Sequence, residues 1–184
     1  PEVSAAERDE AFAEVERESG RLARLVADLL ALARADAGVA LKRQPVDLDA
    51  LVLDVFHTAR VLAHDQEVTL DPFEPIQVLG DEDRLKQLVL ILLDNALKYT
   101  PPGGRVTLGV RRASPGERPT SLTDGLAQAE IVVRDTGVGI SPEALPHVFE
   151  RFFRADPARG RDPGGTGLGL PIAQWITEQH RGSL

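Results

Sequence analysis

The sequence predicts an α+β fold, in which helices packed on a mixed sheet form a two-layer sandwich behind a long N-terminal helix. Residues 5–36 carry apolar side chains at alternating spacings of three and four, which is typical of a helix in a bundle. After residue 44, short strand-like segments alternate with helical patterns. The chain has 184 residues, enough for one ordinary domain plus an appendage.

The first predicted element is a helix that starts at a capping box, Ser4–Glu7, and ends near Asp36, with Gly38 as its stop signal. Its apolar positions form the a/d seam of a coiled coil or bundle. With Ser19 filling one gap, the seam residues are Phe12, Val15, Leu22, Val26, Leu29 and Ala33. Such a helix has no core of its own, so it must pack either against other helices of a bundle or along the rest of the same chain.

Short strands and two helices are predicted between residues 45 and 100. The predicted ranges are a strand over 45–48, a helix over 49–64, strands over 67–70 and 76–79, and a helix that ends at Tyr99. An aspartate precedes each helix as a candidate cap, namely Asp47 or Asp49 for the first and Asp81 for the second.

The remaining elements are a hairpin and a final helix. Val106, Leu108 and Val110 alternate with polar residues, which predicts a half-buried strand over 105–112. A second strand is predicted over 129–134, and the polar residues 113–128 between them are predicted to form a long hairpin loop. The last helix is predicted over 168–179.

The most informative segment is an apolar helical run, residues 88–101, that ends in polar side chains. Asn95, Lys98 and Tyr99 are spaced i, i+3, i+4, so they share one side of a helical turn. An amide oxygen suits a hard cation such as Mg²⁺, and an ammonium suits phosphate oxygens. These three residues together indicate a magnesium-nucleotide site.

Two glycine-rich segments extend this interpretation. Asp135 ends an apolar strand and precedes Gly137 and Gly139, so backbone can approach a flat ring while the carboxylate accepts from the amine of adenine. Residues 164–170 contain alternating glycines before a helix, whose N-terminal N–H groups attract phosphates. Asp-Thr-Gly alone is the composition of an ordinary turn, and the second segment is neither a P-loop nor a dinucleotide fingerprint. Their combination within about eighty residues predicts ATP binding.

On these residues the chain resembles the GHKL-type ATP-binding domain of sensor histidine kinases, a group that includes gyrase, MutL-type repair proteins and certain chaperones. The matching motifs are the N box at Asn95–Thr100, the first glycine box at Asp135–Ile140, the F box at Phe149–Arg154 and the second glycine box at Gly165–Leu170. Residues 154–166 resemble the ATP lid, and Arg21–Leu30 resembles the second helix of the dimerisation and histidine-phosphotransfer domain.

This resemblance implies two parts: residues 1–42 as dimerisation helix and linker, and residues 43–184 as an ATP-binding catalytic domain without its last strands. It implies an ATP-dependent protein histidine kinase that passes the γ-phosphoryl group to a histidine on the dimerisation domain and then to a response regulator receiver domain. That histidine belongs to a first helix that this chain does not contain, so no catalytic residue is assigned. A homodimer through the N-terminal helix bundle is also implied.

The resemblance also implies a set of ligand contacts. Asn95 would coordinate Mg²⁺, Asp135 would hold the adenine amine, and Arg151 or Arg154 would reach the phosphates. The full set of implied ATP-binding residues is Asn95, Lys98, Tyr99, Asp135, Gly137, Gly139, Ile140, Arg151, Arg154, Gly165, Thr166, Gly167, Leu168 and Gly169.

One residue departs from the family pattern. Ile91 stands one helical turn before Asn95, where kinases commonly carry a second Asn and the wider ATPases carry a Glu that activates water. Because Ile can neither bind metal nor act as a base, we expect very slow hydrolysis of ATP and weaker binding of Mg²⁺. Two alternatives stay open: a stand-alone ATPase of the gyrase type, and a pseudokinase or interaction module that binds ATP weakly.

Composition limits the other possible functions. The net charge of −8 disfavours a nucleic-acid surface, and the absence of cysteine excludes disulfides and thiolate metal sites. We expect a cytoplasmic domain of a longer protein, since the chain begins at Pro1 without a methionine and shows no signal peptide; any membrane anchor lies in absent segments. Structural or solvated roles are expected for His57, His64, His147 and His180.

Overall fold

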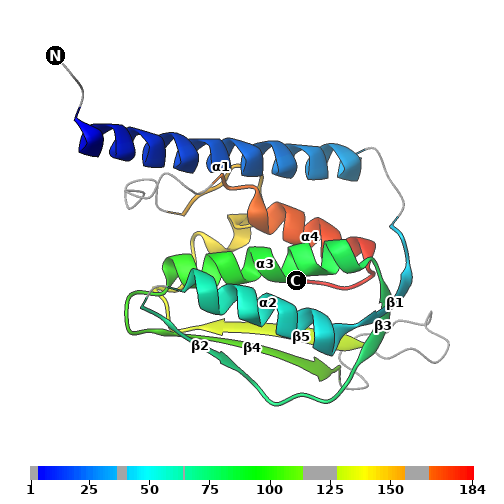
Figure 1. Ribbon diagram of the computed structural model, residues 1–184. Coiled ribbons are helices and arrows are strands. Elements are labelled where there is room, and N and C mark those ends of the chain that lie inside the picture. Colours follow the sequence, from blue (N-terminus) through cyan, green and yellow to red (C-terminus); the bar gives the residue numbers. More distant parts are fainter. Residues whose placement is uncertain (1–3, 37–40, 64, 114–127, 156–165) are drawn as a thin grey trace.

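The computed structural model describes residues 4–36, 41–63, 65–113, 128–155 and 166–184 (Figure 1). The expected helices and strands are present within a residue or two of their predicted bounds, together with one short 3₁₀ turn, η1, that was not predicted. In chain order the elements are α1 (Ala5–Asp36), β1 (Gln44–Asp47), α2 (Leu48–Leu62), β2 (Glu67–Leu70), β3 (Gln77–Gly80), α3 (Glu82–Tyr99), β4 (Arg105–Arg112), β5 (Ala129–Asp135), η1 (Leu145–His147) and α4 (Gly169–Gln179).

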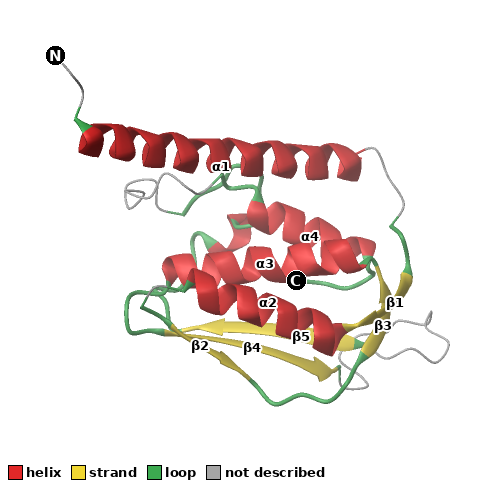
Figure 2. Ribbon diagram, in the orientation of Figure 1, coloured by secondary structure: helices red, strands yellow, loops and turns green. Residues whose placement is uncertain are grey.

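The predicted two layers are confirmed: α2, α3 and α4 lie on one side of the strands (Figure 2). The core lies between the layers, where apolar faces of helices and strands exclude water. Side chains with no exposed surface come from every layer, including Val52 and Val55 of α2, Val89 of α3, Val106 and Leu108 of β4, and Ile172 and Ile176 of α4.

The strands form two separate sheets rather than the single mixed sheet that was expected. β1 pairs antiparallel with β3, whereas β2, β4 and β5 form a three-stranded sheet with β2–β4 parallel and β4–β5 antiparallel. Pro72 and Pro75 separate β2 from β3. Because proline lacks a backbone N–H, this connection cannot continue the β2 ladder, and the chain leaves for the other sheet.

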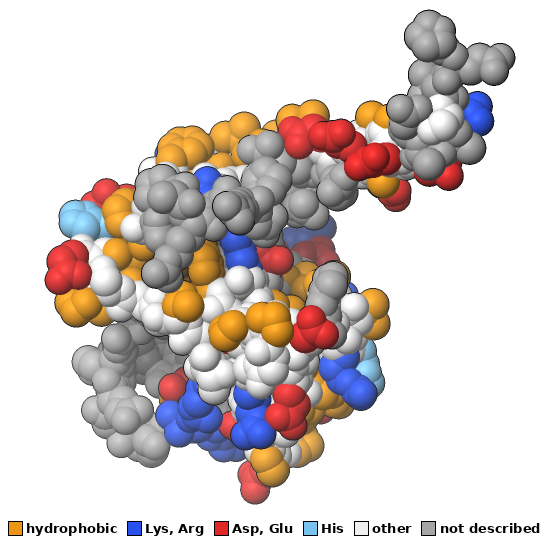
Figure 3. Space-filling model, turned by 90° about the vertical axis from the view of Figure 1, so that its left-hand side faces the viewer, with side chains coloured by type: hydrophobic (Ala, Val, Ile, Leu, Met, Phe, Trp, Pro, Cys, Tyr) orange, Lys and Arg blue, Asp and Glu red, His pale blue; other side chains and the backbone are white. Residues whose placement is uncertain are grey.

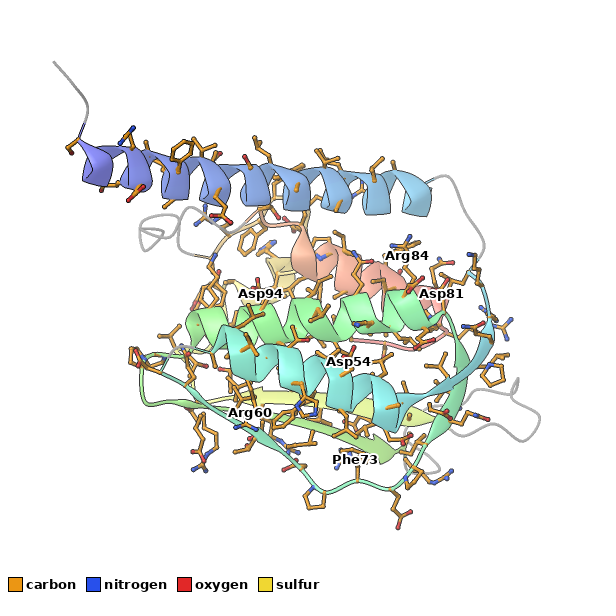
Figure 4. All side chains as sticks on the ribbon, in the orientation of Figure 1. Asp54, Arg60, Phe73, Asp81, Arg84 and Asp94 are labelled. Carbon is orange, nitrogen blue, oxygen red and sulfur yellow. The ribbon has the colours of Figure 1, made fainter. Side chains whose placement is uncertain are left out.

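Asp81 fulfils the predicted role as the N-cap of α3, and it also joins two other parts of the chain. Its Oδ1 accepts from the Arg84 N–H at 3.2 Å, and its Oδ2 accepts from the Lys42 N–H at 3.1 Å. The Asp81 N–H donates to His180 Nε2 at 3.0 Å, while His180 Nδ1 lies 2.7 Å from the Ile176 carbonyl oxygen and donates to it. We call Lys42, Asp81 and His180 the Asp81 junction, which lies where α3 begins and α4 ends (Figure 4).

Replacing Asp81 by alanine is expected to lower the free energy of unfolding by about 2 kcal/mol, since a capping bond and a second carboxylate hydrogen bond are lost together. Urea denaturation followed by circular dichroism measures this change. Asp83→Ala is the matched control, because Asp83 also lies in the first turn of α3 but is exposed and makes no such bonds. Equal losses for the two variants would show that the cap contributes nothing beyond charge at the helix end.

The side-chain cap expected for α2 is wrong. Asp47 occupies the N-cap position but makes no side-chain capping bond, and its Oδ1 accepts from Gln77 Nε2 at 2.9 Å instead. The antiparallel register of β1 and β3 places Gln77 directly opposite Asp47, which explains the competition. Asp49 lies inside the first turn of α2.

Helices α3 and α4 run antiparallel and approach each other at both ends of α4. At one end the Asp81 junction ties the start of α3 to the end of α4. Near the other end, a β-carbon placed on Gly169 would lie 3.2 Å from Ile91 Cγ2. At 1.5 Å per residue, the eleven residues of α4 match the distance along α3 between these two contacts.

Helix α1 lies along α4, on the side away from the sheets (Figure 1). Its apolar seam stays open. Phe12 is 72% exposed, and Val15, Leu22, Val26 and Leu29 are each at least half exposed. Figure 3 shows hydrophobic side chains along the outer edge of this helix. The helix therefore packs on its own chain without burying the seam that was predicted to need a partner.

Among the residues that the structure describes, no helix is both long and apolar enough to cross a membrane. Within the same residues no strand follows α4.

Candidate functional site

The C-terminal end of α3 carries the predicted polar cluster. Asn95 and Lys98 are half-buried and Tyr99 is exposed, with the Lys98 ammonium 5.7 Å from the centre of the Tyr99 ring. The helix end is fixed by Gln66, whose Nε2 donates to the carbonyl oxygens of Leu97 and Thr100 at 3.3 and 3.0 Å. These bonds satisfy carbonyl groups that a helix end otherwise leaves without partners.

The first glycine box lies directly against this helix end. The Val138 N–H donates to the Tyr99 carbonyl oxygen at 3.2 Å, and the Gly137 N–H donates to Asp135 Oδ1 at 2.8 Å. A β-carbon on Gly137 would lie 2.5 Å from the Tyr99 carbonyl oxygen, so only glycine allows this approach. Asp135 and Tyr99 were predicted from separate motifs, and the loop that follows Asp135 lies directly against Tyr99.

The two carboxylate oxygens of Asp135 differ in their hydrogen bonds. Oδ1 holds the Gly137 N–H, whereas Oδ2 accepts no hydrogen bond from the part of the chain that the structure describes. Asp135 is exposed, as are Gly139 and Ile140 beyond it. Gly139 has a φ of 71°, a conformation that other residues rarely adopt. The first glycine box thus offers both an acceptor oxygen and an exposed apolar side chain.

The second glycine box is bonded to the F box. The Phe152 N–H donates to the Gly167 carbonyl oxygen at 2.9 Å, and both residues have positive φ, 66° for Phe152 and 69° for Gly167. A β-carbon on Gly167 would lie 2.7 Å from the Phe152 carbonyl carbon. Thr166 Oγ1 accepts from the N–H of the fully buried Leu168 at 3.2 Å, which fixes the turn into α4.

The N-terminus of α4 then faces the N box. A β-carbon on Gly169 would lie 3.2 Å from Ile91 Cγ2 and 3.9 Å from Asn95 Nδ2. The first N–H groups of a helix lack intrahelical partners and lie at the positive end of its dipole. Asn95 therefore stands beside an anion-attracting helix end, while Ile91 contributes only apolar surface there.

The charged groups of the F box and of the segment before it are exposed. Arg151 and Arg154 lie on the surface of the F box, and Arg151 makes further interactions. A hydrogen bond from its own backbone N–H, and then one from the Ser141 hydroxyl, hold the pKa of Glu143 below its ordinary value. No group of three or more His, Cys, Asp or Glu side chains suited to a metal occurs in the described ranges. A metal here would need ligand oxygens from a bound molecule, as Mg²⁺ takes in nucleotide sites.

The model for the family described as histidine kinase-, DNA gyrase B- and HSP90-like ATPases matches residues 80–184. That range includes α3 with its N-cap Asp81, both glycine boxes and the F box. The chain belongs to this ATPase family.

Relatives of this ATPase-family domain include proteins named as sensor histidine kinases. The probable sensor histidine kinase TcrY of Mycobacterium tuberculosis is 41% identical over 175 residues, which cover 95% of this chain and 34% of TcrY. The structure of full-length ShkA in complex with AMPPNP matches 97% of this chain and 35% of that one, with a TM-score of 0.71 and 32% identity. The mycobacterial sensor histidine kinase MprB matches 75% of this chain and 82% of that one, with a TM-score of 0.61 and 37% identity.

The resemblance inferred from the motifs is thereby confirmed, and so is the fold class. The chain spans about a third of the length of the relative TcrY. The family match does not itself assign a role to any single residue, so the predicted ligand contacts stay predictions.

The structure brings most of the predicted site residues of this ATPase-family domain together around the end of α3. Asn95 to Tyr99, Asp135 to Ile140 and Thr166 to Gly169 meet there through the contacts described above. Gly165 and most of the predicted lid lie outside the described residues, as does His64. Of the other histidines, His57 is exposed beside Phe56, His147 pairs with Glu150, and His180 belongs to the Asp81 junction.

Some structural determinants of the site were not predicted from the sequence. The Tyr99 carbonyl oxygen anchors Val138, and Phe152 adopts a positive φ against Gly167. The hydroxyl of Thr136 also holds the start of β4, as described below. An aromatic residue gives no sequence warning of a left-handed backbone conformation, whereas Thr136 lies between two motif residues and could have been weighed as a hydrogen-bonding partner.

Proposed function

We propose that this chain binds Mg-ATP and supplies its γ-phosphoryl group to a histidine on a dimerisation domain, for relay to a response regulator. The observation that carries the proposal is the meeting of three motifs at one end of α3, where the Asp135 loop bonds to Tyr99 and Gly169 packs beside Asn95. The ShkA structure, which contains the ATP analogue AMPPNP, supports the same function for the shared fold.

In this proposal the base lies at the first glycine box. Asp135 Oδ2 accepts from the amine of adenine, Gly137 and Gly139 allow close approach, and the half-exposed Ile140 packs on the ring. The unused acceptor on Asp135 and the space kept by Gly137 both fit a flat base with an exocyclic donor.

The phosphates lie between α3 and the start of α4. The N–H groups of the Thr166–Gly169 turn and the Lys98 ammonium attract phosphate oxygens. Tyr99 lies beside the ribose or a phosphate. Arg151 or Arg154 adds a further positive charge near the phosphates. Gly165 belongs to this set by motif. Asn95 is the one protein ligand that we assign to Mg²⁺, which neutralises phosphate charge when bound. The chain's own groups bind and orient, so no protein nucleophile is needed.

Residues 1–42 are proposed to form part of a dimerisation domain, and residues 43–184 the catalytic domain. The exposed seam of α1 supports a homodimer through a helical bundle, because such a seam is stable only when a partner covers it. In keeping with sensor kinase relatives, the receiver domain of a response regulator is the proposed phosphoryl acceptor. This part of the protein is proposed to lie in the cytoplasm.

Replacing Asp135 by asparagine is expected to weaken ATP binding at least about tenfold, about 1.4 kcal/mol, because a charged acceptor is lost. Isothermal titration calorimetry measures the affinity. Asp94→Asn is the matched control, since Asp94 is an exposed carboxylate next to Asn95 on α3 that is assigned no contact with the nucleotide and should leave affinity unchanged (Figure 4). Unchanged binding by Asp135→Asn would place the base elsewhere, and a wild-type chain that binds no nucleotide would favour the interaction-module alternative.

Hydrolysis of ATP by the isolated chain is expected to be far slower than about 1 s⁻¹, a modest rate for an enzyme. The reason is Ile91, which lies against Gly169 and offers neither a base nor a metal ligand where water would be activated. A coupled ADP-release assay measures the rate. Turnover near 1 s⁻¹ would support the stand-alone ATPase instead.

Acid-labile phosphohistidine on an added domain that carries the acceptor helix would support the kinase.

A further inference from the structure

Thr136 ends the β4–β5 ladder in an unusual way. In this antiparallel pair Asp135 lies opposite Val106, so Thr136 comes next to Arg105. The Thr136 N–H donates to the Arg105 carbonyl oxygen at 3.0 Å, but the returning bond from the Arg105 N–H goes to Thr136 Oγ1 at 2.9 Å. A side-chain hydroxyl therefore takes the place of a backbone carbonyl as acceptor.

Because a side chain accepts this hydrogen bond, the backbone can leave the sheet immediately after Asp135. Two further bonds then fix the loop, from Gly137 to Asp135 Oδ1 and from Val138 to the Tyr99 carbonyl oxygen. Gly104 makes room on the other side, because a β-carbon there would lie 3.0 Å from Thr136 Oγ1 and 2.4 Å from Thr100 Cγ2. The bond from the Arg105 N–H to the Thr136 hydroxyl is the side-chain hydrogen bond that ties this loop to β4.

We propose that Thr136 is a positioning residue for base recognition: its hydroxyl holds the backbone on which the Asp135 carboxylate is aimed, without touching the nucleotide. This inference rests on the proposed binding of adenine by Asp135. It adds that discrimination between an amine and an oxygen at the base depends on residue 136 as well as on the carboxylate itself.

A double-mutant cycle on the 184-residue chain tests the inference. Thr136→Val keeps the β-branched shape and removes the acceptor, and its affinities for ATP and for inosine triphosphate, which has an oxygen in place of the amine, are measured by calorimetry. We expect ATP affinity to fall about fivefold, the effect of one lost hydrogen bond, and affinity for inosine triphosphate to stay unchanged. In the Asp135→Asn background, Thr136→Val should change ATP affinity less than about twofold, because the two residues act as one unit.

Two control variants separate positioning from stability. Thr136→Ser keeps the hydroxyl and should restore wild-type discrimination. Thr69→Val removes a hydroxyl of the same sheet, one that lies 2.9 Å from Thr107 Oγ1, and should leave both affinities unchanged. Thermal unfolding of each variant shows whether it is folded, and Thr136→Ala replaces the valine variant if that one does not fold.

The outcomes are distinguishable. A wild-type chain that binds the two nucleotides equally contradicts the adenine assignment and this inference with it. If the wild type discriminates and Thr136→Val discriminates equally well, the inference alone fails. Equal losses for ATP and inosine triphosphate, or full additivity with Asp135→Asn, would mean that Thr136 only supports the fold.

Discussion

Gly137→Ala is expected to weaken ATP binding by the proposed site at least about a hundredfold, a change of about 2.7 kcal/mol. A β-carbon at this position would lie 2.5 Å from the Tyr99 carbonyl oxygen and 2.7 Å from Asp135 Oδ1. The first of these atoms belongs to the backbone of α3, which cannot turn aside as a flexible side chain can. The loop must therefore move away from the helix end, and the Asp135 carboxylate moves with it. Calorimetric titration with ATP measures the loss.

Gly139→Ala is the control that separates lack of space from backbone conformation. Gly139 has a φ of 71°, but no atom lies within 4 Å of a β-carbon built there. Its substitution costs only the left-handed conformation, about 1–2 kcal/mol, and should weaken binding much less than Gly137→Ala. A ranking in which Gly139→Ala is the more harmful variant would show that the conformation of Gly139, or its own approach to the base, limits ATP binding more than the contact of Gly137 with α3.

Gly167→Ala is expected to lower the free energy of unfolding by about 3 kcal/mol, because conformational strain and a steric clash occur together. Its φ is 69°, and a β-carbon would lie 2.7–2.9 Å from backbone atoms of Phe152 and Phe153. Phe152 itself has a positive φ, so it has little freedom to yield. Urea denaturation measures the stability, and the hydrogen bond between Phe152 and Gly167 should be lost.

Gly103→Ala provides the comparison for this second prediction. Gly103 has a φ of 78° with nothing within 4 Å of the added carbon, so strain acts alone and the loss should be about 1 kcal/mol. Equal losses at Gly103 and Gly167 would mean that the F box moves freely with the second glycine box, contrary to the tight contact described above.

Features encoded by neighbouring residues were predictable from the sequence. Asp81 caps α3 because the bond runs to Arg84, three residues away, and the alternation of β4 places Val106, Leu108 and Val110 in the core. The N box and both glycine boxes were recognisable for the same reason, since each combines a local element with its polar end. The helix and strand bounds therefore differed little from expectation.

Features that depend on distant residues were not predictable in this way. Asp47 has the same local context as a capping residue, but Gln77, brought opposite it by strand pairing, takes its carboxylate. The division of the strands into two sheets and the positive φ of Phe152 likewise result from tertiary contacts that no short window of sequence contains. In the site, the bond from Val138 to Tyr99 joins residues almost forty positions apart along the chain.

Because α3 and α4 run antiparallel and are in contact at both ends of α4, a movement at one end of this helix pair affects the other end. Lys42, the first hydrogen-bonding residue described beyond α1, attaches to the end where α3 begins, and Asn95 and Gly169 face each other near the opposite end. Helices resist stretching because every turn is held by hydrogen bonds. A shift of α4 along α3 at the Asp81 junction would therefore change the distance between the amide of Asn95 and the helix start at Gly169 by about the same amount, so the junction and the proposed phosphate-binding groups cannot move independently.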